Sequence, residues 1–137
     1  MIAPDTSVVV PALLAWHEAH ARADAALADE VVLLAHVELE AYSTLTRLPP
    51  PVRLDPSAVA TALSGRFPGP RPALPAHDRG RLIAQLAEAG IAGGAAYDGL
   101  IALTAYHCGC TLLTADRRAE RNYGALGADV RWLDEIR

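Results

Sequence analysis

Short, continuous apolar runs alternate with stretches of helical periodicity along the whole chain, and this alternation limits the possible folds more than any other feature. The runs at 31–34 and 111–114 have the length and composition of strands that are buried on both faces. A short strand ending near Asp5 and an edge strand at 130–133 are also expected. The order predicts an α/β fold with a central parallel sheet of about four to five short strands, flanked by helices on both faces.

Helices are expected wherever apolar residues recur three or four positions apart. The expected helices begin at about residue 6 or 7 and lie at 17–28, 36–48, 57–63, 78–89, 95–107 and 117–126. In the helix at 78–89, the apolar face is expected to contain Leu82, Ile83 and Leu86. The segment 49–75 holds eight of the ten prolines and is expected to be peripheral, because proline cannot donate to a central sheet.

A chain of 137 residues has the length of one ordinary domain, so residues 1–137 are expected to share one core. Cys108 and Cys110 are too close in sequence to close a useful loop, and they are expected to be free thiols. No secretory signal or membrane span is visible, which favours the cytoplasm. Trp16 and Trp132 are expected to pack against the core.

The charge balance excludes a broadly basic surface. Sixteen acidic residues stand against twelve basic ones, all of them arginine, which gives a formal net charge of -4. This balance argues against a general nucleic-acid coat protein and against a polybasic membrane binder.

Carboxylates follow the expected strands or begin the helices after them. Asp5 ends the first strand, and Asp116 comes two residues after a later one. Glu38, Glu40 and Asp98 fall in the first turns of helices. In a parallel sheet, ligands gather beyond the carboxyl ends of the strands. The sequence therefore predicts that carboxylates from four chain segments converge at one edge of the sheet.

Each of these acids also has a simpler explanation. Asp5 and Asp116 could cap the helices that follow them, and the other acids could complement the positive ends of helices. Convergence makes capping alone less satisfactory, because anions crowded together raise one another's pKa unless a cation meets them. Ligands that are all oxygen atoms favour Mg2+ or Mn2+ over zinc.

Four ordered motifs then resemble a known family. They are Asp5-Thr6-Ser7 after the first strand, residues 40–47 (Glu-Ala-Tyr-Ser-Thr-Leu-Thr-Arg), residues 93–102 (Gly-Gly-Ala-Ala-Tyr-Asp-Gly-Leu-Ile-Ala) and residues 112–116 (Leu-Leu-Thr-Ala-Asp). In their order and spacing they resemble the motifs of PIN-domain ribonucleases, and most of all the VapC-like toxins of bacterial type II toxin-antitoxin modules. The resemblance covers essentially the whole chain.

The resemblance implies a role for individual residues. Asp5, Glu40, Asp98 and Asp116 match the family's metal-binding and catalytic acids. It alone favours Glu40 over Glu38, since both lie at the border of the same apolar helix face. Thr6 and Thr114 match hydroxyl positions that orient acids or water.

The resemblance also implies an activity and partners. The expected activity is that of a Mg2+- or Mn2+-dependent endoribonuclease, which hydrolyses RNA phosphodiester bonds with a metal-activated water. The expected partners are a cognate VapB-like antitoxin, an RNA substrate and a second copy of the chain in a homodimer.

Phosphate contacts are expected from arginines near these acids. Arg117, Arg118 and Arg121 follow Asp116 closely, and Arg47 lies on the same helix as Glu40. A solvated helix face is the alternative explanation for the first three.

Two other functions remain as alternatives. A non-catalytic PIN-fold module could bind RNA or protein without cutting it. A haloacid-dehalogenase-like phosphatase could use Asp5 as a nucleophile, but that chemistry needs a second aspartate two positions later, where this chain has Ser7.

Overall fold

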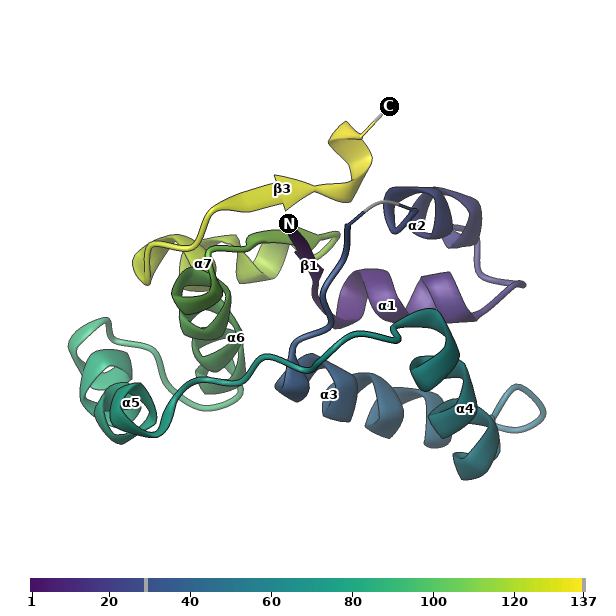
Figure 1. Ribbon diagram of the computed structural model, residues 1–137, viewed down its shortest axis with the longest axis horizontal. Helices are drawn as coiled ribbons and strands as arrows, with labels where there is room; N and C mark the ends of the chain where they lie inside the picture. The colour runs from purple at the N-terminus through teal and green to yellow at the C-terminus, as the bar shows by residue number, and fades with distance from the viewer. Residues whose placement is uncertain (29, 137) are drawn as a thin grey trace.

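The computed structural model describes residues 1–28 and 30–136, which form a parallel sheet flanked by helices (Figure 1). The strands are β1 (Ile2–Pro4), β2 (Thr111–Thr114) and β3 (Val130–Trp132). The helices are α1 (Thr6–Leu13), α2 (His20–Ala26), α3 (Ala35–Thr46), α4 (Pro56–Arg66), α5 (Ala76–Glu88), α6 (Ala95–Cys108) and α7 (Glu120–Ala125), with 3-10 turns η1 (Arg117–Ala119) and η2 (Leu133–Glu135). The predicted α/β class with a parallel sheet is confirmed.

The sheet has the strand order β1-β2-β3, and both strand pairs are parallel. The central strand, β2, places Leu112 opposite Ala3 on one side and Val130 on the other. Leu112 and Leu113 are fully buried, so the middle of the sheet is also the middle of the core. Within residues 1–28 and 30–136 the sheet therefore has three strands, fewer than the four to five expected.

The missing strand is the apolar run at 31–34. Val31 makes only one parallel bridge, to Ile2, and the Val32 amide donates to the Ile2 carbonyl at 2.9 Å. Leu34 is already the N-cap of α3, so the chain turns away from β1 after this single bridge. The run is buried as expected, with Leu33 and Leu34 almost inaccessible, but its backbone does not extend the ladder.

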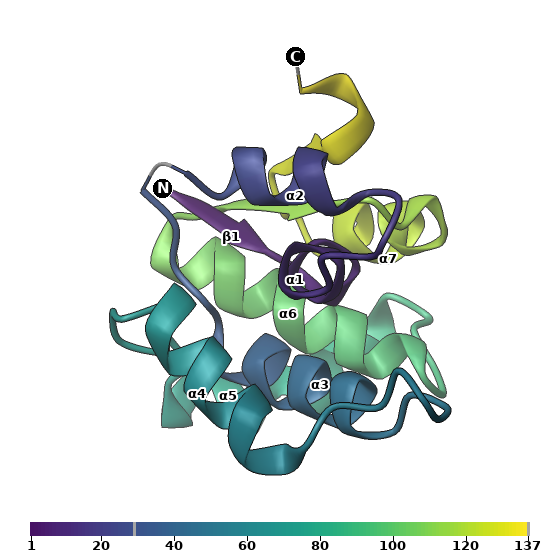
Figure 2. The same ribbon diagram turned by 90° about the vertical axis from the view of Figure 1, so that its right-hand side faces the viewer.

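The helices cover both faces of the sheet (Figure 2). In both views α2 lies on one side of the sheet, while α6 lies on the other side with α3, α4 and α5 beyond it. One large cluster of buried apolar residues joins the sheet to α1, α3, α4 and α6, and a smaller cluster lies between α5 and α6. This arrangement leaves the carboxyl ends of β1 and β2 facing the starts of α1 and η1.

Local chemistry sets several helix ends where the sequence predicts them. The Asp5 side chain accepts a hydrogen bond from the Ser7 amide and caps α1, and Asp55 caps α4 through Ser57 in the same way. Gly109 ends α6 at a φ of 68°, a left-handed conformation that glycine adopts at little cost.

Several smaller expectations are wrong. The proline-rich segment is not wholly peripheral, because Val59 and Leu63 of α4 enter the main core. Ile83 is 70% exposed, since α5 presents only one narrow face, with Leu82 and Leu86, to α6. Trp16 is also exposed, at 59%, on the turn between α1 and α2, whereas Trp132 is buried as expected.

The two cysteines are not free thiols. Cys108 and Cys110 are joined as a disulfide, with their Cα atoms 5.5 Å apart. The left-handed turn at Gly109 folds the chain back between them, which brings together two residues only two positions apart.

No helix among the described residues is both long enough and apolar enough to cross a bilayer.

Candidate functional site

A small cavity of about 80 Å3 opens where β1 and β2 end. Its lining comes from five parts of the chain: the start of α1, the middle of α3, the first half of α6, the loop after β2, and α7. The lining residues are Asp5, Thr6, Ser7, Glu40, Asp98, Ile101, Asp116 and Tyr123. The four acids that match the family motifs therefore all border the same cavity, which we call the acid cavity.

Asp5 is the most buried of the four acids, with 4% of its surface exposed. Its Oδ1 accepts hydrogen bonds from the backbone amide and the hydroxyl of Ser7, and its Oδ2 accepts one from the Tyr123 hydroxyl at 2.8 Å. Burial raises the pKa of Asp5 above its usual value, while these hydrogen bonds partly oppose that rise. Asp5 thus does cap α1, and the cap holds its carboxylate in place while the residue still lines the acid cavity.

A chain of hydroxyl groups connects the end of β1 with the end of β2. Ser7 Oγ lies 3.3 Å from Thr114 Oγ1 and accepts a hydrogen bond from the Ala115 amide at 2.8 Å. Thr114 is fully buried, and its hydroxyl accepts from the Asp116 amide at 3.0 Å. The predicted orienting position at Thr114 therefore lies against the backbone that carries Asp116.

Asp116 caps the 3-10 turn that follows β2. Its Oδ1 accepts from the Arg118 backbone amide at 3.0 Å and from the Arg118 Nε at 3.1 Å. This acid is less buried than Asp5 and lies at the rim of the acid cavity, where its charge is already partly met by a guanidinium.

Asp98 and Glu40 face the cavity from α6 and α3. Burial raises the pKa of both acids. The negative charge of Asp116 raises the pKa of Asp98 further, and the charges of Asp98 and Asp5 raise that of Glu40. Asn122 donates to Asp98 Oδ2 at 3.0 Å, which opposes the rise for Asp98. Each of these two carboxylates therefore lies in the field of a neighbouring acid.

Glu38 takes a different path from Glu40. It forms an ion pair with Arg71, whose guanidinium also donates to the backbone carbonyls of Phe67 and Gly69. Glu38 does not line the acid cavity, and it instead fastens the connection between α4 and α5 to α3. Its neighbour two positions later is the one that lines the cavity.

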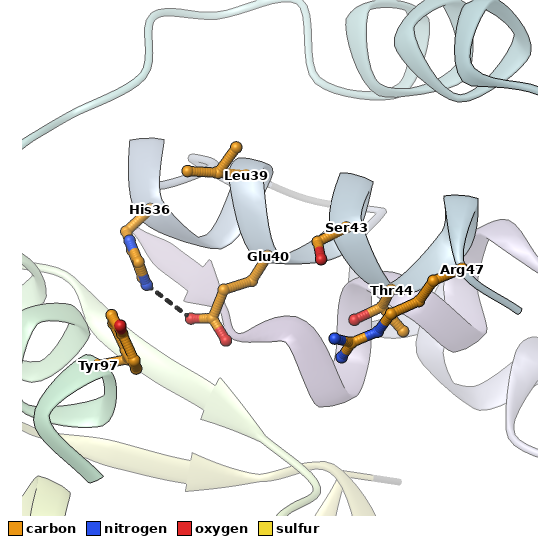
Figure 3. A pocket seen from close by; sticks show the side chains of 7 residues that line it. All are labelled: His36, Leu39, Glu40, Ser43, Thr44, Arg47 and Tyr97. Carbon is orange, nitrogen blue, oxygen red and sulfur yellow. Dashed lines mark ion pairs between the residues drawn. The ribbon is translucent and has the colours of Figure 1, made fainter. Parts of the chain in front are cut away.

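A larger cavity of about 470 Å3 adjoins Glu40 on the outer side of α3 (Figure 3). The residues that line it are His36, Leu39, Glu40, Ser43, Thr44, Arg47 and Tyr97. His36 Nε2 lies 3.1 Å from Glu40 Oε1, and the His36 ring stacks on Tyr97 with the two planes 5° apart. Glu40 therefore lines both cavities, which makes them neighbours. We call the larger one the α3 cavity.

The sequence profile of the PIN domain family matches residues 2–125. The chain belongs to the PIN domain family. The predicted family resemblance is thus confirmed, and the match spans β1 through α7 and includes all four acids of the site.

Named relatives of this PIN domain cover nearly its whole length. "Ribonuclease VapC40" of Mycobacterium tuberculosis strain H37Rv is 46% identical over 130 residues, covering 95% of this chain and 97% of the relative. "Ribonuclease VapC27" of the same strain is 42% identical over 130 residues, covering 94% of each chain. The chain is therefore similar to VapC proteins throughout.

Two solved structures share the fold at lower identity. FitAcB from Neisseria gonorrhoeae has a TM-score of 0.71 and 22% identity, with 99% of this chain and 100% of that chain covered. FitAB bound to an IR36 DNA fragment has a TM-score of 0.73 and 20% identity, with 100% and 98% covered. At this level of identity, the likeness establishes the fold.

The four arginines predicted to contact phosphate have different surroundings in the PIN domain. Arg117 lies over the Trp132 ring at 3.8 Å and forms ion pairs with Asp134 and Glu135. Arg118 pairs with Asp116. Arg121 is exposed on α7, and Arg47 is exposed at the end of α3, where it lines the α3 cavity.

Sequence reasoning did not single out four polar residues around the acids: Ser7, His36, Asn122 and Tyr123. The spacing Asp-x-Ser at 5–7 is a capping pattern and could have indicated Ser7. His36 precedes Glu40 by one helical turn, which could have indicated their contact. Nothing local in the sequence connects Tyr123 with Asp5, which is 118 positions away.

The metal-free PIN domain is expected to become less stable as the pH rises from about 4. Asp5, Glu40 and Asp98 have raised pKa values in the folded state, so the folded chain holds these protons at a pH where the unfolded chain has released them. The unfolded state then binds fewer protons, and the free energy of unfolding falls as the pH rises through the raised pKa values. Thermal unfolding in the presence of a chelator, between pH 4 and pH 8, measures this trend.

Glu40→Gln is the matching variant for that measurement, and Glu88→Gln on the exposed side of α5 is its control. Glu40→Gln should reduce the loss of stability with pH, since it removes one crowded charge. Glu88→Gln should behave as the parent. A parent whose stability rises steadily over this range would contradict the prediction.

Proposed function

We propose that this chain is a metal-dependent endoribonuclease that cuts RNA phosphodiester bonds and acts as the toxin of a toxin-antitoxin pair. The observation that carries the proposal is the convergence of Asp5, Glu40, Asp98 and Asp116 on one cavity of about 80 Å3. The names of the VapC ribonuclease relatives support the same reaction.

The residues of the acid cavity suit a hard divalent cation. Their donor atoms are carboxylate and hydroxyl oxygens, the ligands that Mg2+ and Mn2+ prefer. Thr6 Oγ1 is buried and forms no hydrogen bond among the described residues, and Glu40 Oε1 is buried with only the His36 ring beside it, which leaves polar atoms there for a ligand. Among the same residues, no three His, Cys, Asp or Glu side chains are already grouped closely enough to enclose an ion.

The acids of the cavity are held apart by their hydrogen-bond and ion-pair partners. Asp5 is engaged by Ser7 and Tyr123, Asp116 by Arg118, and Glu40 by His36. We propose that Asp5, Glu40, Asp98 and Asp116 hold the cation after small rotations. When bound, Mg2+ or Mn2+ supplies positive charge against the phosphate and lowers the pKa of water at the site.

The protein residues would then position the reacting groups. Tyr123 and Ser7 hold the two oxygens of Asp5, and Asn122 holds one oxygen of Asp98, so neither carboxylate turns freely. Thr114 fixes the backbone at Asp116, and the Thr6 hydroxyl is placed to orient an acid or a water. Such positioning is what an in-line displacement at phosphorus requires.

The proposal includes partners and location. We propose that the chain binds a cognate antitoxin of the VapB type, forms a homodimer and acts in the cytoplasm, where RNA substrates are found.

We also propose that residues 1–137 form one domain. Its support is that Leu133 lies in the main core and Ile136 packs against it, beyond the end of the family match at 125.

Metal-dependent cleavage of a panel of single-stranded RNAs tests the proposed function. Cleavage should require Mg2+ or Mn2+ and should stop when a chelator is added. RNA that is bound but left intact under all of these conditions would favour the non-catalytic module instead.

Substitution of Arg47 should weaken the salt dependence of RNA binding, whereas substitution of Arg117 should not. The exposed guanidinium of Arg47 can neutralise a phosphate, but that of Arg117 is already held by Asp134 and Glu135. Each phosphate contact on single-stranded RNA contributes about 0.7 to the slope of log affinity against log salt. Arg47→Ala should reduce the slope by about that amount. Fluorescence anisotropy between about 50 and 200 mM salt, in an Asp98→Asn background that leaves RNA intact, provides the measurement. Equal slopes for Arg47→Ala and the parent would remove Arg47 as a contact.

A further inference from the structure

We infer that the α3 cavity is a binding subsite for an RNA base next to the phosphate that is cut, with Tyr97 as its stacking surface. This inference rests on the proposed function and adds where the substrate lies. It starts from the position of the cavity, which shares Glu40 with the acid cavity. A nucleotide whose phosphate faces the acids would thus have its neighbour within reach of this second cavity.

The size and lining of the α3 cavity suit a base. Its volume of about 470 Å3 falls within the range of small-ligand pockets. The lining combines apolar and aromatic surface from Leu39 and Tyr97 with the hydroxyls of Ser43 and Thr44. Bases of single-stranded RNA are recognised in this way, by aromatic stacking together with a few polar contacts.

The Tyr97 ring is both exposed and held in place, as stacking with an RNA base requires. It is 58% exposed, although it is one of the large aromatic residues and lies directly beside Asp98. The His36 ring lies nearly parallel to it, with the two ring centroids 5.4 Å apart, and supports it from one side (Figure 3). An aromatic ring that is held flat and remains exposed provides a surface for a base without an added cost of ordering the side chain.

The far end of the cavity provides a positive charge. Arg47 is the C-cap of α3, seven residues after Glu40, so the two are about 10 Å apart along the helix axis. Among the described residues Arg47 forms no ion pair, unlike Arg117 and Arg118 on the other side of the site. Carboxylates at one end and a guanidinium at the other give the cavity a direction that an RNA strand can follow.

A base analogue whose fluorescence reports stacking tests the subsite directly. The probe is a set of short single-stranded oligoribonucleotides, each with 2-aminopurine at one position, and the protein is the Asp98→Asn variant of the full chain. Binding should quench the fluorescence at one position of the probe. Adding Tyr97→Ala should abolish the quenching and weaken binding about ten-fold, while Tyr97→Phe should preserve both, because the ring stacks and the hydroxyl is not needed.

Tyr106→Ala is the matched control. Tyr106 is 68% exposed on the same helix, but it is nine residues, or two and a half turns, from Tyr97 and so faces the opposite side. This variant should bind and quench as the Asp98→Asn parent does. Melting temperatures of all variants should agree, since both tyrosines are exposed.

The outcomes separate the subsite from the proposed function. If the unmodified chain cuts RNA but Tyr97→Ala changes neither quenching nor affinity, the subsite is refuted and the ribonuclease proposal stands. If Tyr97→Ala leaves RNA binding unchanged and weakens self-association in sedimentation, the cavity is a protein interface and the inference is again refuted. Failure of cleavage by the unmodified chain on every RNA contradicts the proposed function itself, whatever the quenching shows.

Discussion

Replacement of Asp98 by asparagine should reduce metal-dependent RNA cleavage by more than about a hundred-fold. Losing a residue that only supports a metal ligand typically costs between 10- and 100-fold, and Asp98 is proposed as a ligand itself. The side chain keeps its size, and an amide at this position can still bond to Asn122. Initial rates of cleavage at saturating Mg2+ or Mn2+ provide the measurement.

The same variant should fold as well as the parent or better in the absence of metal. Burial and the charge of Asp116 both raise the pKa of Asp98, which means that its negative charge is unfavourable there. The Asp98→Asn protein should therefore have an equal or higher melting temperature in chelator, and it should gain less from added Mn2+. Glu88→Gln, which removes one charge from the exposed side of α5, is the control for net charge and should retain full activity. An Asp98→Asn protein that cuts RNA at the parent's rate would exclude Asp98 from the mechanism.

Replacement of Leu113 by alanine should have the largest effect on stability. Leu113 is fully buried in the central strand, between Pro4 of β1 and Arg131 of β3. Truncation of a buried leucine to alanine costs about 2 to 5 kcal/mol, because it removes apolar contacts and leaves a void. For a domain of this size the melting temperature should fall by roughly 10 °C.

The position of Leu113 links this loss to the site. Its carbonyl accepts a hydrogen bond from the Asp5 amide at 2.9 Å, so the strand that packs the core also holds the first acid. Chemical denaturation gives the free energy of unfolding, and Ile83→Ala is the control, since Ile83 is 70% exposed and should change stability by less than about 0.5 kcal/mol. A Leu113→Ala protein as stable as this control would contradict the assigned core.

Much of the fold could be predicted because local sequence and global structure agree. The helix after Asp5 and the helix that ends at Gly109 each combine an apolar pattern with a capping residue, and the strand at 111–114 is a continuous run that is almost wholly buried. The convergence of the acids on one cavity followed from the same logic, since parallel strands deliver the residues after them to one edge.

The errors occur where apolar character does not determine the partner. The run at 31–34 is buried, yet it makes one bridge because the next helix begins at once. Ile83 and Trp16 are apolar but lie on faces that no other element covers. Periodicity identifies the apolar residues that could be buried, whereas the packing of neighbouring elements decides which of them are buried.

The polar contacts of the site were beyond sequence reasoning for a related reason. The bond from Tyr123 to Asp5 joins residues 118 positions apart, and it depends on how α7 packs against the start of α1. The contact of Asn122 with Asp98 has the same origin. Asp5 and Asp116 could be chosen by their place after strands, and Glu40 was favoured over Glu38 only by the family resemblance. The groups that hold these acids come from elements whose placement the pattern does not specify.

The ion pairs at the rim have a kinetic consequence. Arg117 and Arg118 form ion pairs with nearby carboxylates. If Asp5, Glu40, Asp98 and Asp116 are left out of the count, the chain has twelve acidic and twelve basic residues. Once the proposed cations offset the charge of these four acids, little long-range attraction remains to draw RNA in from solution. Association should therefore proceed at the ordinary rate of about 10^5 to 10^7 M-1 s-1, without electrostatic acceleration. Discrimination among RNAs would then depend on how long each one stays bound.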